Sequence, residues 1–119
     1  MTEPRGTLDT TVLVALRESV GDDPAFLAEL VGDFLADAPD QLAALRDATD
    51  SGDAPGAMRA AHTLKGNSRT FGATELGSIC QDAEAAARAG DLDGVLARLD
   101  AIESEWRRVS AALVAWRDG

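Results

Sequence analysis

The last quarter of the chain carries an apolar repeat that limits the folds available to it. Between residues 92 and 116, successive apolar residues are separated by steps that alternate between three and four. This spacing places them on one face of an α-helix as a heptad seam, which is typical of helices that cross at ~20° in a left-handed bundle. The seam consists of Leu92, Val95, Leu99, Ile102, Trp106, Val109, Leu113 and Trp116.

Four earlier segments show the same helical periodicity. We therefore predict helices over residues 8–20, 24–50, 54–71, 73–89 and 92–117. Several boundaries combine a glycine that ends one helix with an aspartate that caps the next. Pro39 lies within the second range, and we expect a kink or a short break there. Ser68, on the inner face of the third, is expected to bond the carbonyl four residues back.

Only a few residues separate each predicted helix from the next, and short connections of this kind make consecutive helices antiparallel. The sequence thus predicts an all-α fold, an antiparallel up-down-up-down four-helix bundle with the short first helix laid across one end. The 119 residues suit a single domain, in which residues 1–6 are expected to be flexible.

The net charge of −10 argues against several classes of function. Nucleic acids and anionic membranes both bind basic surfaces, so neither is an expected partner. No apolar run approaches the ~18–20 residues of a membrane span, and the first residues show no signal pattern, so we expect a cytoplasmic protein. The single cysteine, Cys80, cannot form an internal disulfide and lies on an apolar face, where we expect a buried, inert thiol.

One stretch in the middle of the chain contains no acidic residue. It holds three cations, Arg59, Lys65 and Arg69, together with the only histidine, His62. Its formal charge is +3, whereas the rest of the chain carries −13. On a helical wheel at 100° per residue, His62 lies at the centre of the outward face, with these three cations around it.

These residue types suit phosphoryl transfer through a phosphohistidine. An exposed imidazole is largely neutral at pH 7 and is then a competent nucleophile. Lys65, three residues beyond His62, can reach an anion held at the imidazole. Gly66, one residue further, leaves open space beside the ring for another macromolecule. A glycine within a helix costs ~1 kcal/mol relative to alanine, and its presence there indicates a functional or packing role.

The sequence that begins at the histidine resembles a family signature. Residues 62–73 read HTLKGNSRTFGA, and Leu76 and Cys80 follow at helical spacing. This pattern is similar to the signature of the histidine-containing phosphotransfer (HPt) domain family. Asn67 and Phe71 depart from the usual residues, which affects packing and partner fit but leaves the histidine, lysine and glycine intact.

The resemblance implies a phosphorelay intermediate. His62 would accept a phosphoryl group on Nε2, from a receiver-domain aspartate or a cognate kinase, and pass it to the aspartate of another receiver. Lys65 would stabilise the phosphoryl group during transfer. The residues expected to contact the partner are Met58, Arg59, Gly66 and Arg69.

The same resemblance implies partners and the absence of a cofactor. The partners would be response-regulator receiver domains and a sensor or hybrid histidine kinase, and the Mg²⁺ needed for transfer would belong to the receiver. We expect no kinase activity, because the sequence contains no P-loop, kinase-type glycine-rich loop or nucleotide-binding glycine motif. A monomer is expected, because the heptad seam is used within one bundle.

Three alternatives remain open from the sequence. An HPt-like bundle that only binds a receiver or kinase would not need the intact His62, Lys65 and Gly66. A hydrolase with His62 as general base would lack a second histidine and a serine or cysteine nucleophile motif. The chain could also be a domain cut from a larger kinase, although a chain from Met1 to just past the seam is expected to be free-standing.

Overall fold

The computed structural model describes residues 7–119, and this part of the chain forms five α-helices. They are α1 (Thr10–Ser19), α2 (Pro24–Asp50), α3 (Ala54–Thr70), α4 (Thr74–Arg88) and α5 (Leu92–Asp118). Every bound lies within two residues of the range predicted from the sequence. The flexibility expected for residues 1–6 concerns a segment outside the described residues.

Short local signals start and end the helices. Aspartate side chains accept hydrogen bonds from first-turn backbone N–H groups at the starts of four helices. These caps are Asp9, Asp23, Asp53 and Asp91. Gly52 and Gly90, which precede two of them, have φ angles of 78° and 77°. The cap by Asp9 explains why α1 begins two residues later than predicted.

α2 continues as an α-helix through Pro39, so the expected break does not occur. Proline lacks a backbone donor and its ring crowds the preceding turn, which costs ~3 kcal/mol in a helix interior. Pro39 is exposed, whereas its neighbour Ala38 is buried in the core. Packing on the buried side of α2, before and after the proline, therefore outweighs the local preference for a break.

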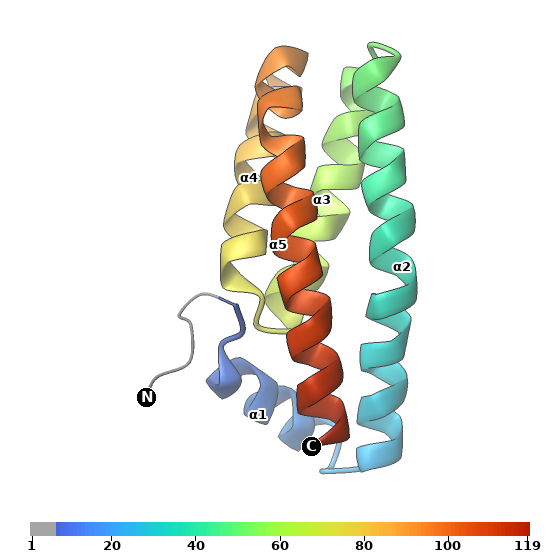
Figure 1. Cartoon of the computed structure of the whole chain (residues 1–119), viewed down its shortest axis with the longest axis vertical. Helices are drawn as coiled ribbons and strands as arrows, with labels where there is room; N and C mark the ends of the chain where they lie inside the picture. The colour runs from blue at the N-terminus through green and yellow to red at the C-terminus, as the bar shows by residue number, and fades with distance from the viewer. Residues whose placement is uncertain (1–6) are drawn as a thin grey trace.

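Helices α2 to α5 form the four-helix bundle predicted from the sequence (Figure 1). Consecutive helices run in opposite directions, and α5 closes the ring by packing against α2. α2 and α5 each have 27 residues, whereas α3 and α4 have 17 and 15. The longer pair extends beyond the shorter pair at one end, and α1 lies across that end (Figure 1).

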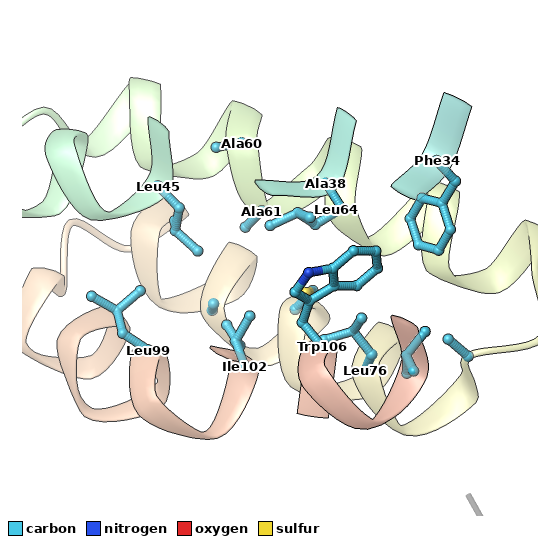
Figure 2. Close-up of a cluster of buried hydrophobic side chains, with 14 of the residues drawn as sticks. Phe34, Ala38, Leu45, Ala60, Ala61, Leu64, Leu76, Leu99, Ile102 and Trp106 are labelled. Atoms are coloured by element: carbon cyan, nitrogen blue, oxygen red, sulfur yellow. The ribbon is translucent and has the colours of Figure 1, made fainter. Parts of the chain in front are cut away.

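The core is a continuous apolar column between the helices (Figure 2). The α5 seam is buried from Val95 to Leu113, whereas Trp116 at its end is half-buried. The indole of Trp106 packs edge-on against Phe34 with ring centroids 5.2 Å apart, and Phe34 stacks on Phe71 at 4.7 Å. This aromatic cluster joins α2, α5 and the end of α3.

Two small side chains with polar atoms are buried in the bundle. Burial raises the pKa of the Cys80 thiol to about 12, which confirms a buried, inert thiol. Ser68 is fully buried, but its hydroxyl has no hydrogen-bond partner. The predicted bond from Ser68 to the carbonyl of Leu64 is therefore wrong, although Thr70 forms the equivalent bond to Gly66.

Gly72 connects α1 to the bundle. Its φ is 73°, a left-handed conformation that favours glycine, and it forms the turn between α3 and α4. Its carbonyl accepts a hydrogen bond of 2.7 Å from the backbone N–H of Asp9. A Cβ atom at Gly72 would lie only 2.7 Å from the Asp9 carbonyl oxygen. Gly90 has a similar φ, but nothing lies within 4 Å of the corresponding position.

We expect Gly72→Ala to lower the free energy of unfolding by about 2–4 kcal/mol, because left-handed strain and steric overlap add. Gly90→Ala meets only the strain and is expected to cost about 1–2 kcal/mol. Urea unfolding of both variants measures the difference. Equal losses would show that the contact between Gly72 and Asp9 does not constrain the packing of α1.

Candidate functional site

His62 lies in the middle of α3, on the side that faces away from the core. Its side chain is 66% exposed, as predicted from the sequence. The opposite side of the helix is buried and includes Ala57, Ala61 and Leu64. Because these apolar residues recur every three or four positions, their burial turns His62 outward.

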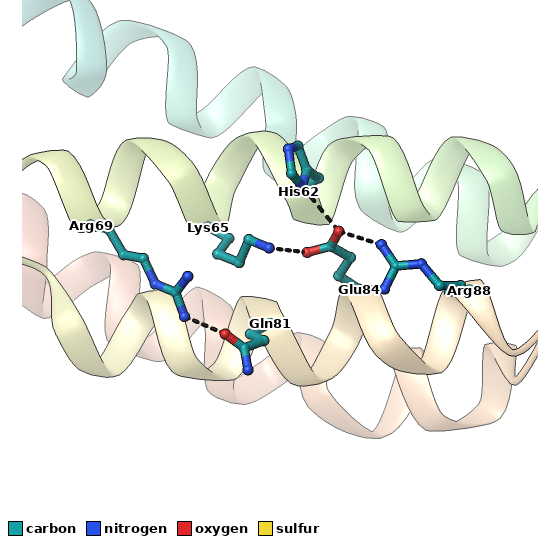
Figure 3. A network of polar contacts seen from close by, with 6 residues as sticks. All are labelled: His62, Lys65, Arg69, Gln81, Glu84 and Arg88. Carbon is teal, nitrogen blue, oxygen red and sulfur yellow. Dashed lines mark hydrogen bonds and ion pairs between the residues drawn. The ribbon is translucent and has the colours of Figure 1, made fainter.

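A polar network links His62 to α4 (Figure 3). The Nδ1 atom of His62 lies 2.9 Å from Oε2 of Glu84, and Nη2 of Arg88 lies 2.8 Å from the same oxygen. The Lys65 ammonium forms an ion pair with the other oxygen, Oε1, at 2.7 Å, with an angle outside regular hydrogen-bond geometry. Glu84 is therefore the centre of the network.

The Glu84 carboxyl is buried and yet ionised, because its side chain is only 4% exposed but has three partners. Burial acts to raise the pKa of this carboxyl. The contacts from Lys65, His62 and Arg88 outweigh burial and lower the pKa to about 2. At neutral pH the carboxylate thus carries no proton and acts only as an acceptor.

The ionisation of Glu84 determines which nitrogen of His62 is reactive. Since the carboxylate can only accept, Nδ1 of His62 must donate the hydrogen bond. A neutral ring has only one proton, so Nε2 keeps its lone pair. In Figure 3 the Nδ1 edge of the ring faces Glu84, and the other nitrogen is turned away from it. The exposed ring therefore presents a nucleophilic Nε2 to solvent.

The network contains two residues, Glu84 and Arg88, that the sequence reasoning missed. The available signal was the position of Glu84, one turn beyond Cys80 and next to Ala83 on the apolar face of α4. A carboxylate on a buried face needs a partner, and the neighbouring helix offers Lys65. Arg88 follows Glu84 at i+4, the spacing of a helical ion pair.

A hollow beside His62 contains two of the predicted partner-binding residues. The His62 hollow is lined by Met58, Arg59, Thr63, Glu84 and Arg88 together with the histidine. Gly66 lies outside it, with nothing within 4 Å of the position where a Cβ atom would stand.

The other two predicted cations are directed toward α4. Lys65 is only 20% exposed in its side chain, because its ammonium reaches Glu84. Arg69 contacts Gln81 on α4, further along the helix from His62 (Figure 3). The structure therefore places Lys65 within the network around His62 and Arg69 at its edge.

α4 contributes one carboxylate, Glu84, and one guanidinium, Arg88, to the network around His62, and their formal charges cancel.

Within residues 7–119, no group of three or more histidine, cysteine and acidic side chains is arranged to hold a metal ion. A search of the same residues for a helix long and apolar enough to span a membrane finds none.

Comparisons with known proteins agree with this geometry. The model of the Hpt domain family matches residues 29–112. The structure of histidine-containing phosphotransfer protein B (HptB) from Pseudomonas aeruginosa PAO1 is 30% identical, covers 97% of both chains and has a TM-score of 0.88. The HPT domain of an Hpt sensor hybrid histidine kinase from Shewanella shares the fold, with 17% identity, 92% coverage of both chains and a TM-score of 0.73. No protein of curated function matches the sequence significantly.

Proposed function

This chain belongs to the Hpt domain family, and from that premise we propose that His62 is its phosphoacceptor. Hpt domains are phosphotransfer intermediates that work with histidine kinases and receiver domains in two-component relays, so a role in such a relay follows from membership. The proposal adds the residue, the donor and the acceptor. His62 takes the phosphoryl group from a receiver aspartate or a cognate kinase and passes it to another receiver aspartate, and the protein acts as a monomer.

The observation that carries this proposal is the orientation of the His62 ring. Glu84 accepts the Nδ1 proton, which leaves the lone pair of the exposed Nε2 free for attack. In the transfer, this lone pair forms an N–P bond while the P–O bond to the partner's aspartate breaks. The electron pair of the broken bond stays on the aspartate carboxylate, so no proton has to move during the step.

Two cations lie close enough to help the transfer. Lys65 and Arg88 both contact Glu84 and so are held next to His62. Their positive charge offsets the negative charge on the phosphoryl oxygens, the main catalytic contribution that a protein makes to phosphoryl transfer. Arg88 uses one N–H group for Glu84 and keeps others for an anion. The Mg²⁺ for the reaction is supplied by the receiver's acidic pocket, and this chain brings no cofactor.

The partner contacts follow from the exposed surface around His62. Met58 and Arg59 line the His62 hollow, Gly66 leaves open space, and Arg69 extends the basic surface along α3. An acidic receiver pocket is attracted to this basic surface on an otherwise acidic protein. Such steering raises the association rate more than the affinity.

The proposal is tested by incubating the protein with a panel of phosphorylated receiver domains. We expect one phosphate per chain, stable to base and labile to acid, as a phosphohistidine is. Because the chain has one histidine, such a label identifies its site. Stable binding to a receiver without any label would instead favour a protein that only binds its partners.

Gly66→Ala is expected to stabilise the protein and to slow transfer from a receiver. Alanine is favoured over glycine by about 0.5–1 kcal/mol within a helix, and no atom of the chain obstructs the added methyl group. The methyl group narrows the approach to His62, and a displacement near 1 Å at a reacting centre costs up to about 100-fold in rate. Urea unfolding and rapid-quench transfer measure the two effects.

Gly32→Ala is the matched control. Gly32 lies in α2 and is also free of neighbours within 4 Å of a Cβ atom. The same gain in stability is expected there, with an unchanged transfer rate. Equal transfer by the Gly66→Ala variant and the wild type would show that partners do not approach over Gly66.

A further inference from the structure

Glu84 contacts the ring nitrogen of His62 that takes no part in bonding to phosphorus. We propose that this carboxylate holds the proton on Nδ1 after Nε2 has been phosphorylated, so that the phosphoryl group later leaves from a protonated ring. Glu84 is then a positioning residue that keeps the phosphohistidine ready for transfer. The inference rests on the proposed role of His62 as phosphoacceptor.

The chemical reason lies in the leaving group. The form of the ring that attacks phosphorus is the neutral one, with a proton on Nδ1 and a lone pair on Nε2. Once Nε2 has formed the N–P bond, a ring that keeps its Nδ1 proton carries a positive charge. When this N–P bond breaks, the bonding pair returns to Nε2 and neutral imidazole leaves. If the Nδ1 proton were lost first, the leaving group would be an imidazolide anion, a far stronger base and a much poorer leaving group.

Among the charged groups near the ring, Glu84 is the one that favours keeping the proton on Nδ1. These groups are Arg59 and Lys65 on α3 and Glu84 and Arg88 on α4. Asp47 and Asp53 line a separate hollow on the α2 side, which shares Arg59 and Thr63 with the His62 hollow but does not include His62. The three cations oppose a positive charge on the ring. Among the described residues, Glu84 alone provides a carboxylate that bonds to His62, at 2.9 Å from Nδ1.

Burial strengthens this interaction. The Glu84 side chain is nearly inaccessible to water, so its bond to Nδ1 has little competition from solvent. Lys65 and Arg88 keep the carboxylate ionised, as its lowered pKa shows. An opposite charge at this distance moves a titration midpoint by about 1–3 pH units. The phosphorylated ring is therefore expected to keep its Nδ1 proton to a pH well above that of an unassisted phosphohistidine.

The single histidine allows a direct measurement. The protein is phosphorylated with phosphoramidate, and the two ring nitrogens are followed by ¹⁵N NMR over a pH titration, in the native state and in urea. We expect the midpoint for loss of the Nδ1 proton to be higher in the native protein than in urea by about 1–3 pH units. Equal midpoints in the two states overturn the inference, and this comparison needs no variant.

Glu84→Gln tests the charge while keeping a hydrogen-bond acceptor. We expect this variant to lower the native midpoint by about 1–3 pH units. Above both midpoints, transfer to a receiver is expected to slow about tenfold for every pH unit by which the midpoint falls, because the protonated fraction drops by the same factor. An unchanged midpoint and an unchanged pH profile of transfer would overturn the inference.

Glu105→Gln is the matched control. Glu105 is similarly buried and is held by an arginine, Arg108, at 2.7 Å, but it lies on α5 and outside the His62 network. We expect its midpoint and pH profile to equal those of the wild type. A change as large as that of Glu84→Gln would show a general effect of losing a buried carboxylate, and would overturn the specific role of Glu84.

Failure of the wild type to take up phosphate would overturn the proposed function, whereas uptake with equal midpoints in the native state and in urea overturns this inference alone.

Discussion

Replacing His62 with glutamine is expected to abolish phosphate uptake. Glutamine has no nucleophilic lone pair comparable to that of Nε2, and the chain contains no second histidine to replace it. Cys80, another potential nucleophile, is buried and its thiol pKa is raised to about 12. Incubation with a phosphorylated receiver, followed by measurement of the acid-labile label, should show full labelling of the wild type and none of the variant.

The protein should remain folded after this substitution, so a loss of labelling can be attributed to the missing imidazole and not to unfolding. The His62 side chain is 66% exposed, so a glutamine there creates no cavity. We expect the His62→Gln variant to unfold at nearly the urea concentration of the wild type and to keep binding receivers. Equal labelling of the two proteins would refute the assignment of His62. Equal binding without labelling of either protein would indicate an interaction module in place of a phosphotransfer protein.

The second large effect is a loss of folding stability at acidic pH, and it depends on the protonation of Glu84. The pKa of its carboxyl is about 2 in the folded protein, against 4.5 for an unperturbed glutamate. The carboxylate thus binds its proton less readily when folded, and its contribution to stability is complete above pH 4.5. This contribution is lost as the pH falls from 4.5 toward 2 and amounts to about 3 kcal/mol.

Urea unfolding at pH 7, 4.5 and 3 measures this loss. The wild type should become less stable over the last interval, and the Glu84→Gln variant should show a shallower decline because it has no proton to take up at this position. At pH 7 the variant should be the less stable protein, since Lys65 and Arg88 lose their charged partner. Parallel declines of the two proteins with pH would contradict the lowered pKa of Glu84.

Much of the architecture was predictable because it depends on local patterns. The apolar periodicity of the helices and the aspartate caps are local signals that act within one or two turns. A prediction based on them placed every helix bound within two residues of the structure. Pro39 shows the limit of such reasoning. Its local preference favours a break, but the core contacts of Ala38 and its neighbours on α2 come from other helices and are not encoded beside the proline.

Some features of the site also follow from local sequence patterns, whereas others depend on how the helices pack. The exposure of His62, with Lys65 and Gly66 one turn away, could be predicted from the sequence alone, because all three lie on one helix whose apolar face sets its rotation. Which ring nitrogen is free could be learned only from the packing of the helices. That choice depends on Glu84, which is 22 residues away and meets His62 only when α4 packs against α3. The apolar surface that brings these helices together also buries Glu84, and burial among cations is what makes a carboxylate able to orient the ring.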